Sequence, residues 1–177
     1  MTRFRVAAFV ALLSAADGQP ALAGGAETIR DCILAAAAVN RIPPGVILIL
    51  LNVEGGMLGR VSANTNGTVD IGPMQVNDIW LPELAAHWRA SLADTLHALR
   101  DNFCANVEAG SWILRRGLDE AHGDLWGGVG YYHSHDPEHE AAYLRAVLRE
   151  VIRLTGGRTP KPVNAPAKST TQATGRP

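Results

Sequence analysis

The sequence predicts a mainly α-helical domain with one small irregular or β excursion near its middle. Three observations predict this class. Apolar residues recur at helical spacing in several segments. Alanine and aliphatic residues supply most of the 47% hydrophobic content, while aromatic residues make up only 6%. A single stretch, 55–73, is rich in Gly, Asn and Thr, which is typical of loops and tight hairpins.

The first half of the chain predicts two helices and then the excursion. Residues 26–39 are alanine-rich, with apolar residues on one helical stripe. Residues 46–51 are apolar throughout, which fits either a buried strand or a buried helix. Their leucine content and the preceding Pro43-Pro44 favour a helix, which we expect to end near Glu54. Within the excursion, Asn66-Gly67 predicts a tight turn.

The second half predicts further helices. The first covers 75–86. The second is capped by Asp101 or Asn102 and ends at Gly117, and the third covers the glycine-containing segment 119–134. The last begins at Asp136-Pro137. Trp112 and Trp126 fall on helical stripes, so we expect them in the core. Trp80 and Trp88 stay open between core packing and stacking on a ligand.

Composition and charge bound the class of protein. The chain has 177 residues, a formal net charge of −1 and 19% charged residues. These values exclude a strongly basic nucleic-acid binder and a highly charged disordered chain. The charge is uneven, because residues 1–23 carry +1, residues 158–177 carry +4, and residues 24–157 therefore carry −6. We expect one mildly acidic domain over 24–157 and a disordered basic tail over 158–177.

The first 23 residues are typical of a cleavable export signal. Arg3 and Arg5 precede a short apolar run, and a small-x-small site at 21–23 puts the mature start near Gly24. An uncleaved anchor is the alternative, and the shortness of the apolar run disfavours it. No run of apolar residues has the length of an ordinary membrane span.

Export has a consequence for the cysteines. Cys32 and Cys104 are the only two in the chain, and exported proteins meet an oxidising compartment. We therefore predict a disulfide between them rather than two buried free thiols. Such a bridge stabilises a fold by about 4 kcal/mol in the chain-entropy description.

Glu54 is the first candidate for chemistry. It ends an all-apolar segment, where loss of hydration raises the pKa of a carboxyl group. A Glu with a raised pKa keeps its proton near neutral pH and can donate it, as a general acid must. The two glycines that follow would let a ligand approach closely. The alternative is an ordinary helix-end Glu that points at solvent.

A polar stretch follows at 64–77 and reads Asn-Thr-Asn-Gly-Thr-Val-Asp-Ile-Gly-Pro-Met-Gln-Val-Asn. It supplies a second carboxylate, Asp70, and several amides. Such a segment suits sugars, whose hydroxyls bind amides and whose ring faces pack on apolar groups. Paired carboxylates beside a cleft are the usual machinery of glycosidic-bond cleavage. The alternative for Asp70 is structural, as a cap of the 75–86 helix or a partner in turn hydrogen bonds.

Three motifs together resemble the lytic transglycosylases. They are Glu54, the run Gly-Pro-Met-Gln-Val-Asn at 72–77, and the run Gly-Tyr-Tyr-His-Ser at 130–134. The Cys104-x-Asn106 element adds to the resemblance, which covers most of 24–157. The most similar subgroup is that of small exported enzymes of conjugation, type III and type IV secretion, and pilus systems. The resemblance implies a lysozyme-like helical domain whose excursion lies beside the active cleft.

The resemblance also implies a role for each matching residue. Glu54 would act as acid and then base to cleave the bond between N-acetylmuramic acid and N-acetylglucosamine, leaving an anhydro sugar without use of water. Asp70 matches the second carboxylate of a similar segment in C-type lysozymes and would stabilise positive charge or bind sugar hydroxyls. The substrate-binding residues would be Gly72, Met74, Gln75, Asn77, Tyr132 and His133. Two positions depart from the family, since Gly55 stands where Ser is common and His133 where Asn is common.

The implied setting is a periplasmic monomer that acts on peptidoglycan glycan strands. The expectations include no cofactor, no metal and no nucleic acid, with components of a secretion, conjugation or pilus machine as partners. Two alternatives stay open, a lysozyme-type hydrolase in which Asp70 assists an attacking water, and a non-catalytic scaffold that binds peptidoglycan. A zinc site at His133, His135 and His139 is disfavoured, because the second His of the helical zinc motif is missing.

Overall fold

The structure is a computed structural model that describes residues 24–156 and, among them, the side chains of 28–156. The predicted export signal at 1–23 and the predicted tail at 158–177 lie outside the described residues. The described part is mainly α-helical with a small three-stranded antiparallel sheet. The fold class predicted from the sequence is therefore confirmed.

Eleven elements follow one another along the described residues. The helices are α1 (Gly24–Asn40), α2 (Pro44–Glu54), α3 (Leu81–Trp88), α4 (Leu92–Asp101), α5 (Phe103–Glu120), α6 (Leu125–His133) and α7 (Pro137–Leu154). The strands are β1 (Val61–Ala63), β2 (Val69–Ile71) and β3 (Val76–Asn77), and a short 3-10 helix, η1 (Asp78–Trp80), joins β3 to α3.

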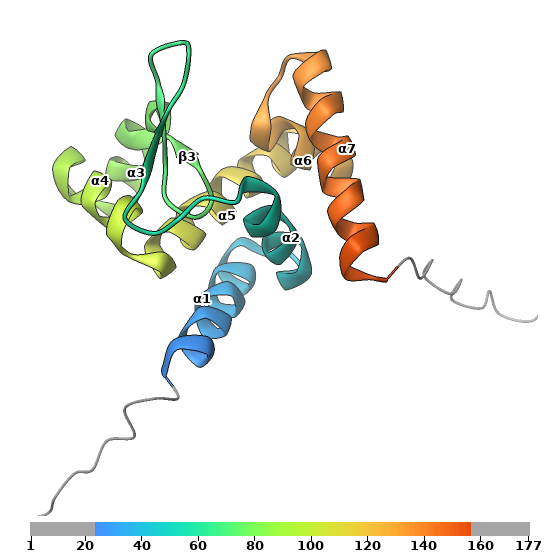
Figure 1. The fold of residues 1–177 in the computed structure, drawn as a ribbon. Helices are drawn as coiled ribbons and strands as arrows, with labels where there is room; N and C mark the ends of the chain where they lie inside the picture. Colours follow the sequence, from blue (N-terminus) through green and yellow to red (C-terminus); the bar gives the residue numbers. More distant parts are fainter. Residues whose placement is uncertain (1–23, 157–177) are drawn as a thin grey trace, which may run out of the picture.

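Helix α5 runs through the middle of the molecule (Figure 1). It packs against α1, α4 and α6, while α7 packs against both α6 and α2. The hairpin formed by β1 and β2 lies with α3 and α4 on one side of α5, and α6 and α7 lie on the other (Figure 1). The end of α2 therefore lies between two groups of elements, which is where the candidate site forms.

The apolar segment at 46–51 is a helix, as its leucine content predicts. Pro44 occupies the first turn of α2, where its missing N–H costs no hydrogen bond. Ile47 and Leu50 are completely buried. They belong to a core to which α5 contributes Val107, Ala109, Ile113, Leu114 and Leu118. Because α2 inserts into this core, its last residue is held in a fixed and poorly hydrated place.

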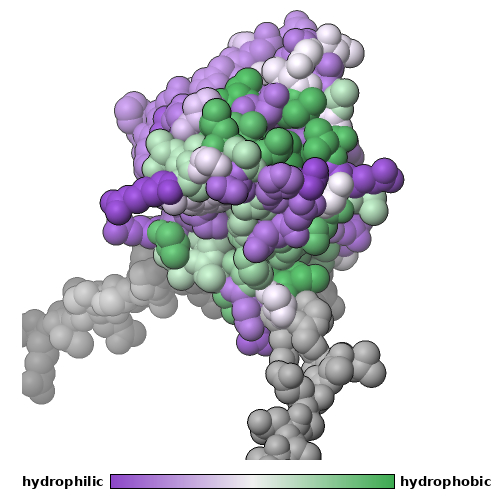
Figure 2. Space-filling view, turned by 90° about the vertical axis from the view of Figure 1, so that its left-hand side faces the viewer, coloured by the Kyte–Doolittle hydropathy of each residue, from purple (hydrophilic) through white to green (hydrophobic). Residues whose placement is uncertain are grey.

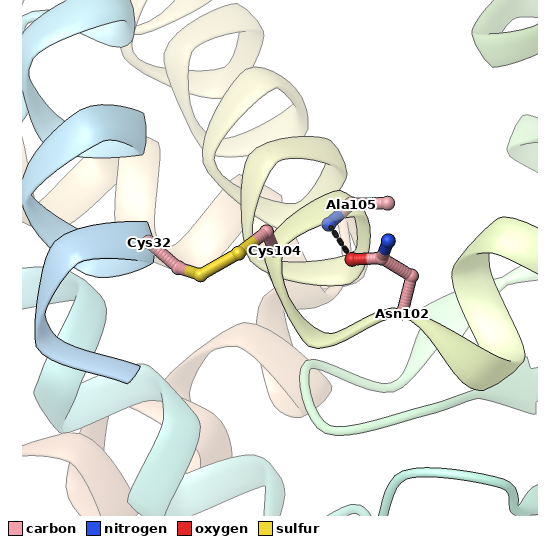
Figure 3. The surroundings of a disulfide bond; sticks show 4 residues. All are labelled: Cys32, Asn102, Cys104 and Ala105. Atoms are coloured by element: carbon pink, nitrogen blue, oxygen red, sulfur yellow. Dashed lines mark hydrogen bonds between the residues drawn. A yellow bond between two sulfur atoms is a disulfide. The ribbon is translucent and has the colours of Figure 1, made fainter. Parts of the chain in front are cut away.

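The two cysteines form the predicted disulfide, which links α1 to the start of α5 (Figure 3). The Cα atoms of Cys32 and Cys104 are 4.9 Å apart. The side chain of Asn102 caps α5 by accepting a hydrogen bond from the Ala105 N–H at 3.1 Å, as predicted for this residue. The bridge thus joins the first described helix to the capped end of the central one.

The predicted helix at 75–86 is only partly correct. The chain first forms β3, which pairs with β2 through Asp70↔Asn77 and Ile71↔Val76, then turns through η1, and becomes α-helical only at Leu81. Pairing with β2 overrides the local helical pattern, and Gln75 has a left-handed backbone (φ 48°) that no α-helix tolerates. The predicted turn at Asn66-Gly67 does join β1 to β2.

The predicted stop of α5 at Gly117 is wrong, because the helix continues to Glu120. A Cβ at Gly117 would lie 2.8 Å from the carbonyl oxygen of Gly128, so this glycine lets α6 approach. Trp126 was expected in the core and is instead 46% exposed. The buried face of α6 is formed by Gly128, Val129 and Gly130, which turns Trp126 outward. Helix α4 has no counterpart among the sequence-based expectations.

The surface viewed from the hairpin side mixes apolar and polar side chains (Figure 2). Apolar groups are more frequent in its upper middle, and strongly polar side chains project at both edges (Figure 2). Such mixing is usual for a folded surface. Among the described helices, none alone has the length and hydropathy of a membrane span. Thr28–Asn40 and α2 reach these values only as a pair, and a bend of 118° lies between them.

Candidate active site

Glu54 is the last residue of α2, and its side chain is half-buried. Gly55 follows with a left-handed backbone (φ 61°) and donates its N–H to the carbonyl oxygen of Leu51, which ends the helix. Burial raises the pKa of the Glu54 carboxyl to about 7, a hydrogen bond from Tyr143 opposes this change, and the charge of Asp70 adds to it. The first expectation for Glu54, a carboxyl that keeps its proton near neutral pH, agrees with this position.

Tyr143 is the hydrogen-bond partner of the Glu54 carboxyl. Its hydroxyl donates a hydrogen bond to Glu54 Oε1 at 2.5 Å across 89 residues of sequence. Tyr143 lies on α7 and is only 7% exposed. Burial and the nearby charge of Glu54 raise the pKa of the phenol, so it remains a neutral donor. The contact between α2 and α7 therefore fixes the direction of the Glu54 side chain.

Asp70 lies on the central strand, opposite Ser62 of β1 and Asn77 of β3. Asn77 Nδ2 donates to Asp70 Oδ1 at 2.7 Å. Asn77 also caps η1, since its Oδ1 accepts the Ile79 N–H at 3.2 Å. Asn77, rather than Asp70, is thus the helix-capping residue of this segment. Asp70 lines the same cavity as Glu54, and its charge raises the pKa of the Glu54 carboxyl.

The hydroxyl of Thr68 forms hydrogen bonds to three neighbouring amide side chains. Thr68 Oγ1 accepts hydrogen bonds from Asn64 Nδ2 at 3.1 Å and from Asn77 Nδ2 at 2.9 Å. It donates to Asn66 Oδ1 at 2.8 Å. Three amide side chains are therefore held in place before any ligand arrives. Preorganised donors and acceptors of this kind suit a ligand with many hydroxyl groups.

The glycine pair after Glu54 brings two distant loops into contact. A Cβ at Gly56 would collide with the carbonyl oxygen of Gly72 and would lie 2.6 Å from Gln75 Nε2. Gln75 Nε2 donates to the same Gly72 carbonyl at 2.9 Å. Only glycine permits this approach, which places the Gln75 side chain beside the end of α2.

One cavity of about 740 Å³ collects these groups. Its lining includes six of the eight predicted catalytic and substrate-binding residues, namely Glu54, Asp70, Gln75, Asn77, Tyr132 and His133. The small sheet with its β2–β3 turn, α2 and α6 supply them, so the cavity lies between the two groups of elements in Figure 1. Its volume is in the range of cavities that bind small molecules or sugar units.

The other two predicted residues, Gly72 and Met74, do not line this cavity. Met74 is completely buried, and its side chain packs against Gly110 of α5. Gly72 has a left-handed backbone (φ 69°), and a Cβ there would collide with the side chain of Asn106. Both residues shape the loop that presents Gln75 and Asn77. The Met74 carbonyl oxygen accepts the hydroxyl of Tyr132 at 2.8 Å, which ties this loop to α6.

Asn106 anchors that loop from α5. It is completely buried. Its Oδ1 accepts the Met74 N–H at 2.7 Å, and its Nδ2 donates to the carbonyls of Ile71 at 2.9 Å and Leu99 at 3.0 Å. The sequence drew attention to this residue within the Cys104-x-Asn106 element without giving it a role. The side chain thus satisfies two backbone groups at the loop between β2 and β3 and one carbonyl of α4, which allows all three to be buried.

The three histidines of the disfavoured zinc site have separate partners. His133 stacks on Tyr143, His135 is 3.0 Å from Glu120, and His139 is 3.5 Å from Asp136. Within residues 28–156, no group of three His, Cys, Asp or Glu side chains is arranged to hold a metal ion.

Several residues at the site were not predicted from the sequence. Tyr143 lies on the apolar stripe of α7, where a tyrosine cannot be told from an ordinary core residue. Trp80, His139 and Asn64 line the cavity as well. Trp80 had been left open, and its place at the edge of the cavity, 6.2 Å from Trp112 between ring centres, leaves it able to contact a ligand.

The chain was also compared with known proteins. No model of a protein family matches it, and no curated protein matches it. The function must therefore be inferred from the chemistry of the cavity and from the motifs that line it.

Proposed function

We propose that this protein is a peptidoglycan lytic transglycosylase. The observation that supports this most is the Glu54 carboxyl, which is half-buried, has a pKa raised to about 7, and lines the same cavity as Asp70. A group with this pKa is partly protonated at neutral pH and regains its charge after giving up the proton. The three matching motifs supply the choice of substrate.

In the proposed reaction Glu54 first acts as an acid. Its proton passes to the oxygen between N-acetylmuramic acid and N-acetylglucosamine, and the bond from that oxygen to the muramic anomeric carbon breaks. The leaving sugar departs as an alcohol, and positive charge develops at the anomeric carbon. Asp70, which lines the same cavity, would stabilise that charge.

Glu54 then acts as a base. Its carboxylate removes the proton of the muramic C6 hydroxyl, whose oxygen bonds to the anomeric carbon. The product is the anhydro sugar, the carboxyl has its proton back, and no water is consumed. The hydrogen bond from Tyr143 holds the carboxyl in one place through both transfers. The amides at Asn64, Gln75 and Asn77 would bind sugar hydroxyls and acetamido groups.

A second candidate is a lysozyme-type hydrolase, and the position of Asp70 in the same cavity favours it. Two carboxyl groups flanking one bond can direct a water to the anomeric carbon. The two reactions share the first proton transfer and differ in the group that attacks. They therefore leave different chain ends, anhydro in one case and reducing in the other.

The proposal includes a setting. The motifs resemble those of small exported enzymes, so we infer that the protein acts in the periplasm on glycan strands and opens the wall locally for a secretion, conjugation or pilus machine. It would do so as a monomer, without a cofactor. These parts of the proposal rest on the resemblance and on the predicted export signal at 1–23.

The first experiment is digestion of purified peptidoglycan, with mass analysis of the soluble products. We expect the wild type to release products with anhydro ends. Glu54→Gln should release them about 100-fold more slowly, because the amide cannot donate a proton. Glu138→Gln is the matched control. Glu138 is exposed at the start of α7 and does not line the cavity, so this variant should keep full activity.

The products separate the candidates. Reducing ends, together with loss of activity in Asp70→Asn, would identify a hydrolase. Folded wild-type protein that binds peptidoglycan and releases nothing would contradict an enzymatic role and leave the scaffold alternative. Equal activity in Glu54→Gln and the wild type would exclude Glu54 as the proton donor.

A further inference from the structure

Two stacked aromatic rings lie next to the Glu54 carboxyl. The first is Tyr143 of α7, whose hydroxyl donates to Glu54 Oε1 at 2.5 Å. The second is His133, the last residue of α6, whose ring stacks on that phenol. Their ring centres are 4.4 Å apart, and the two planes differ by only 2°. No motif in the sequence indicated a contact between these two residues.

The two rings meet the cavity differently. His133 lines the cavity, whereas Tyr143 is not among the lining residues and is 7% exposed. The imidazole of His133 therefore lies between the phenol ring and the cavity. The phenol hydroxyl of Tyr143 donates its hydrogen bond to Glu54, at the end of α2. Two side-chain torsions set the direction of a tyrosine ring, so a flat partner stacked on one face limits the rotamers that the ring can adopt and the directions in which its hydroxyl can point.

The charged and titratable groups around Glu54 come from three elements. Tyr143 and His139 lie on α7, Tyr132 and His133 on α6, and Asp70 on β2. Burial and Asp70 raise the pKa of Glu54, and the hydrogen bond from Tyr143 lowers it. Burial also lowers the pKa of His133, with a further decrease from His139 and an opposing increase from Asp70. A neutral imidazole is thus the form that stacks on Tyr143 near neutral pH.

We propose that His133 and Tyr143 are a pair of positioning residues, in which the imidazole holds the phenol and the phenol hydroxyl fixes both the direction and the protonation of Glu54. The inference rests on the proposed function in one respect only, that Glu54 is the proton donor. It assigns to His133 a task besides the substrate contact expected from the sequence. It also explains how an aromatic ring at this position keeps the acid aligned where the similar family often has Asn.

The chain supplies its own control pair. Tyr131 and His135 stack with ring centres 4.6 Å apart and planes that differ by 17°. They belong to the same helix end as His133, and neither lines the cavity. Tyr131→Phe and His135→Ala therefore remove the same chemical groups from the same part of the fold without touching Glu54.

The test is a direct titration of the Glu54 side-chain carboxyl by carbon NMR on the purified protein. In Tyr143→Phe we expect the midpoint to rise by about one pH unit, because the charged form loses a hydrogen bond while the ring and the burial remain. Tyr131→Phe should leave the midpoint unchanged. The wild type gives a second measurement, since the Cζ resonance of Tyr143 should follow the Glu54 titration.

A double-mutant cycle tests the stack. His133→Ala should move the Glu54 midpoint, and the same change made in Tyr143→Phe should move it by less than half as much, because the phenol hydroxyl transmits most of the effect. His135→Ala should move nothing. Equal shifts in both backgrounds would show that His133 acts on Glu54 directly or through solvent, and would overturn the pairing.

A merely structural role gives a different pattern. Tyr143→Phe would then lower the thermal midpoint without moving the Glu54 titration, and this outcome overturns the proposal. Failure of the proposed function shows elsewhere, as a wild-type protein that releases no products although its Glu54 titration responds as expected. If the protein is active, the alkaline limb of its pH–rate profile should move with the Glu54 midpoint in each variant, and KM should stay unchanged in Tyr143→Phe, because Tyr143 does not line the cavity.

Discussion

Glu54 owes its chemistry to its place at the end of α2. Most residues of this helix are apolar, and Ile47 and Leu50 on its inner face are completely buried, so its last turn packs against the core. A solvent-exposed Glu would lose its proton near pH 4.5, and burial raises this pKa to about 7. The gain in function has a cost in stability, because the folded protein must hold a charge in a poorly hydrated place above that pH.

The cost predicts a pH-dependent stability for Glu54→Gln. The folded pKa of about 7 is higher than the unfolded value of 4.5, so the wild type loses stability as pH rises from 4.5 to 7. The amide cannot ionise. We therefore expect the variant to be more stable than the wild type at pH 8, by up to about 3 kcal/mol, and about equally stable at pH 4.

Urea unfolding of both proteins at the two pH values measures this difference. The two proteins differ only at residue 54, so the comparison isolates Glu54 together with its interaction with Asp70. Glu138→Gln should show no such pH dependence, since Glu138 is exposed. The same difference at pH 4 and at pH 8 would mean that Glu54 keeps an ordinary pKa.

At this scale most of the catalytic and substrate-binding residues predicted from the sequence do line the cavity. It succeeded where a residue type has few other uses, as with a Glu at the end of an apolar helix. It did not predict Tyr143, because a tyrosine on an apolar stripe is usually a core residue. It placed Met74 and Gly72 among the substrate contacts, but a motif does not reveal which side chains of a loop turn inward. In this loop Gln75, which has a left-handed backbone, lines the cavity, whereas Met74 is completely buried.

At the scale of elements, the site depends on two loops that touch. The loop after α2 begins with Gly55 and Gly56, and the segment between β2 and β3 contains Gly72 and Gln75. Neither loop has regular structure of its own. Asn106 fixes the second loop from α5, and the close approach at Gly56 aligns the first loop with it.

The two glycines give a matched pair of variants. Gly55→Ala places a Cβ in open space and strains only the left-handed backbone, so we expect a loss of about 1 kcal/mol of stability. Gly56→Ala drives a Cβ into the carbonyl oxygen of Gly72 and must displace the loop that presents Gln75. We expect its lytic rate to fall at least ten times further than that of Gly55→Ala, by about 1.4 kcal/mol in transition-state terms.

Rates on purified peptidoglycan, set beside urea unfolding, check this pair. A larger loss of rate in Gly55→Ala than in Gly56→Ala would show that the close approach between the two loops does not matter for activity.

The elements also show the limits of what sequence patterns can predict. Pairing of β3 with β2 overrode the helical pattern at 75–86, and the approach of α6 explains why Gly117 lies inside a helix rather than at its end. Both effects come from distant parts of the chain.

At the scale of the whole molecule, α5 connects the parts of the site. It packs on α1, α4 and α6, and it carries Asn106, which holds the loop between β2 and β3. The disulfide attaches α1 to this helix two residues before Asn106. The sequence predicted the pairing because only two cysteines were present, but it could not show that the bridge lies next to the anchor of the site.

The bridge closes a loop of 72 residues, and its removal should cost about 4 kcal/mol of unfolding free energy, because the unbridged unfolded chain is freer. The double variant Cys32→Ala with Cys104→Ala removes it without leaving reactive thiols. Urea unfolding should show the loss in the double variant and in the reduced wild type, and reductant should not affect the variant further. At urea concentrations too low to unfold the double variant, Asn106 still holds the loop between β2 and β3. The midpoint of the Glu54 titration should therefore stay near pH 7. A titration that shifts along with stability would mean that the bridge, and not Asn106 alone, holds the active-site loop in register.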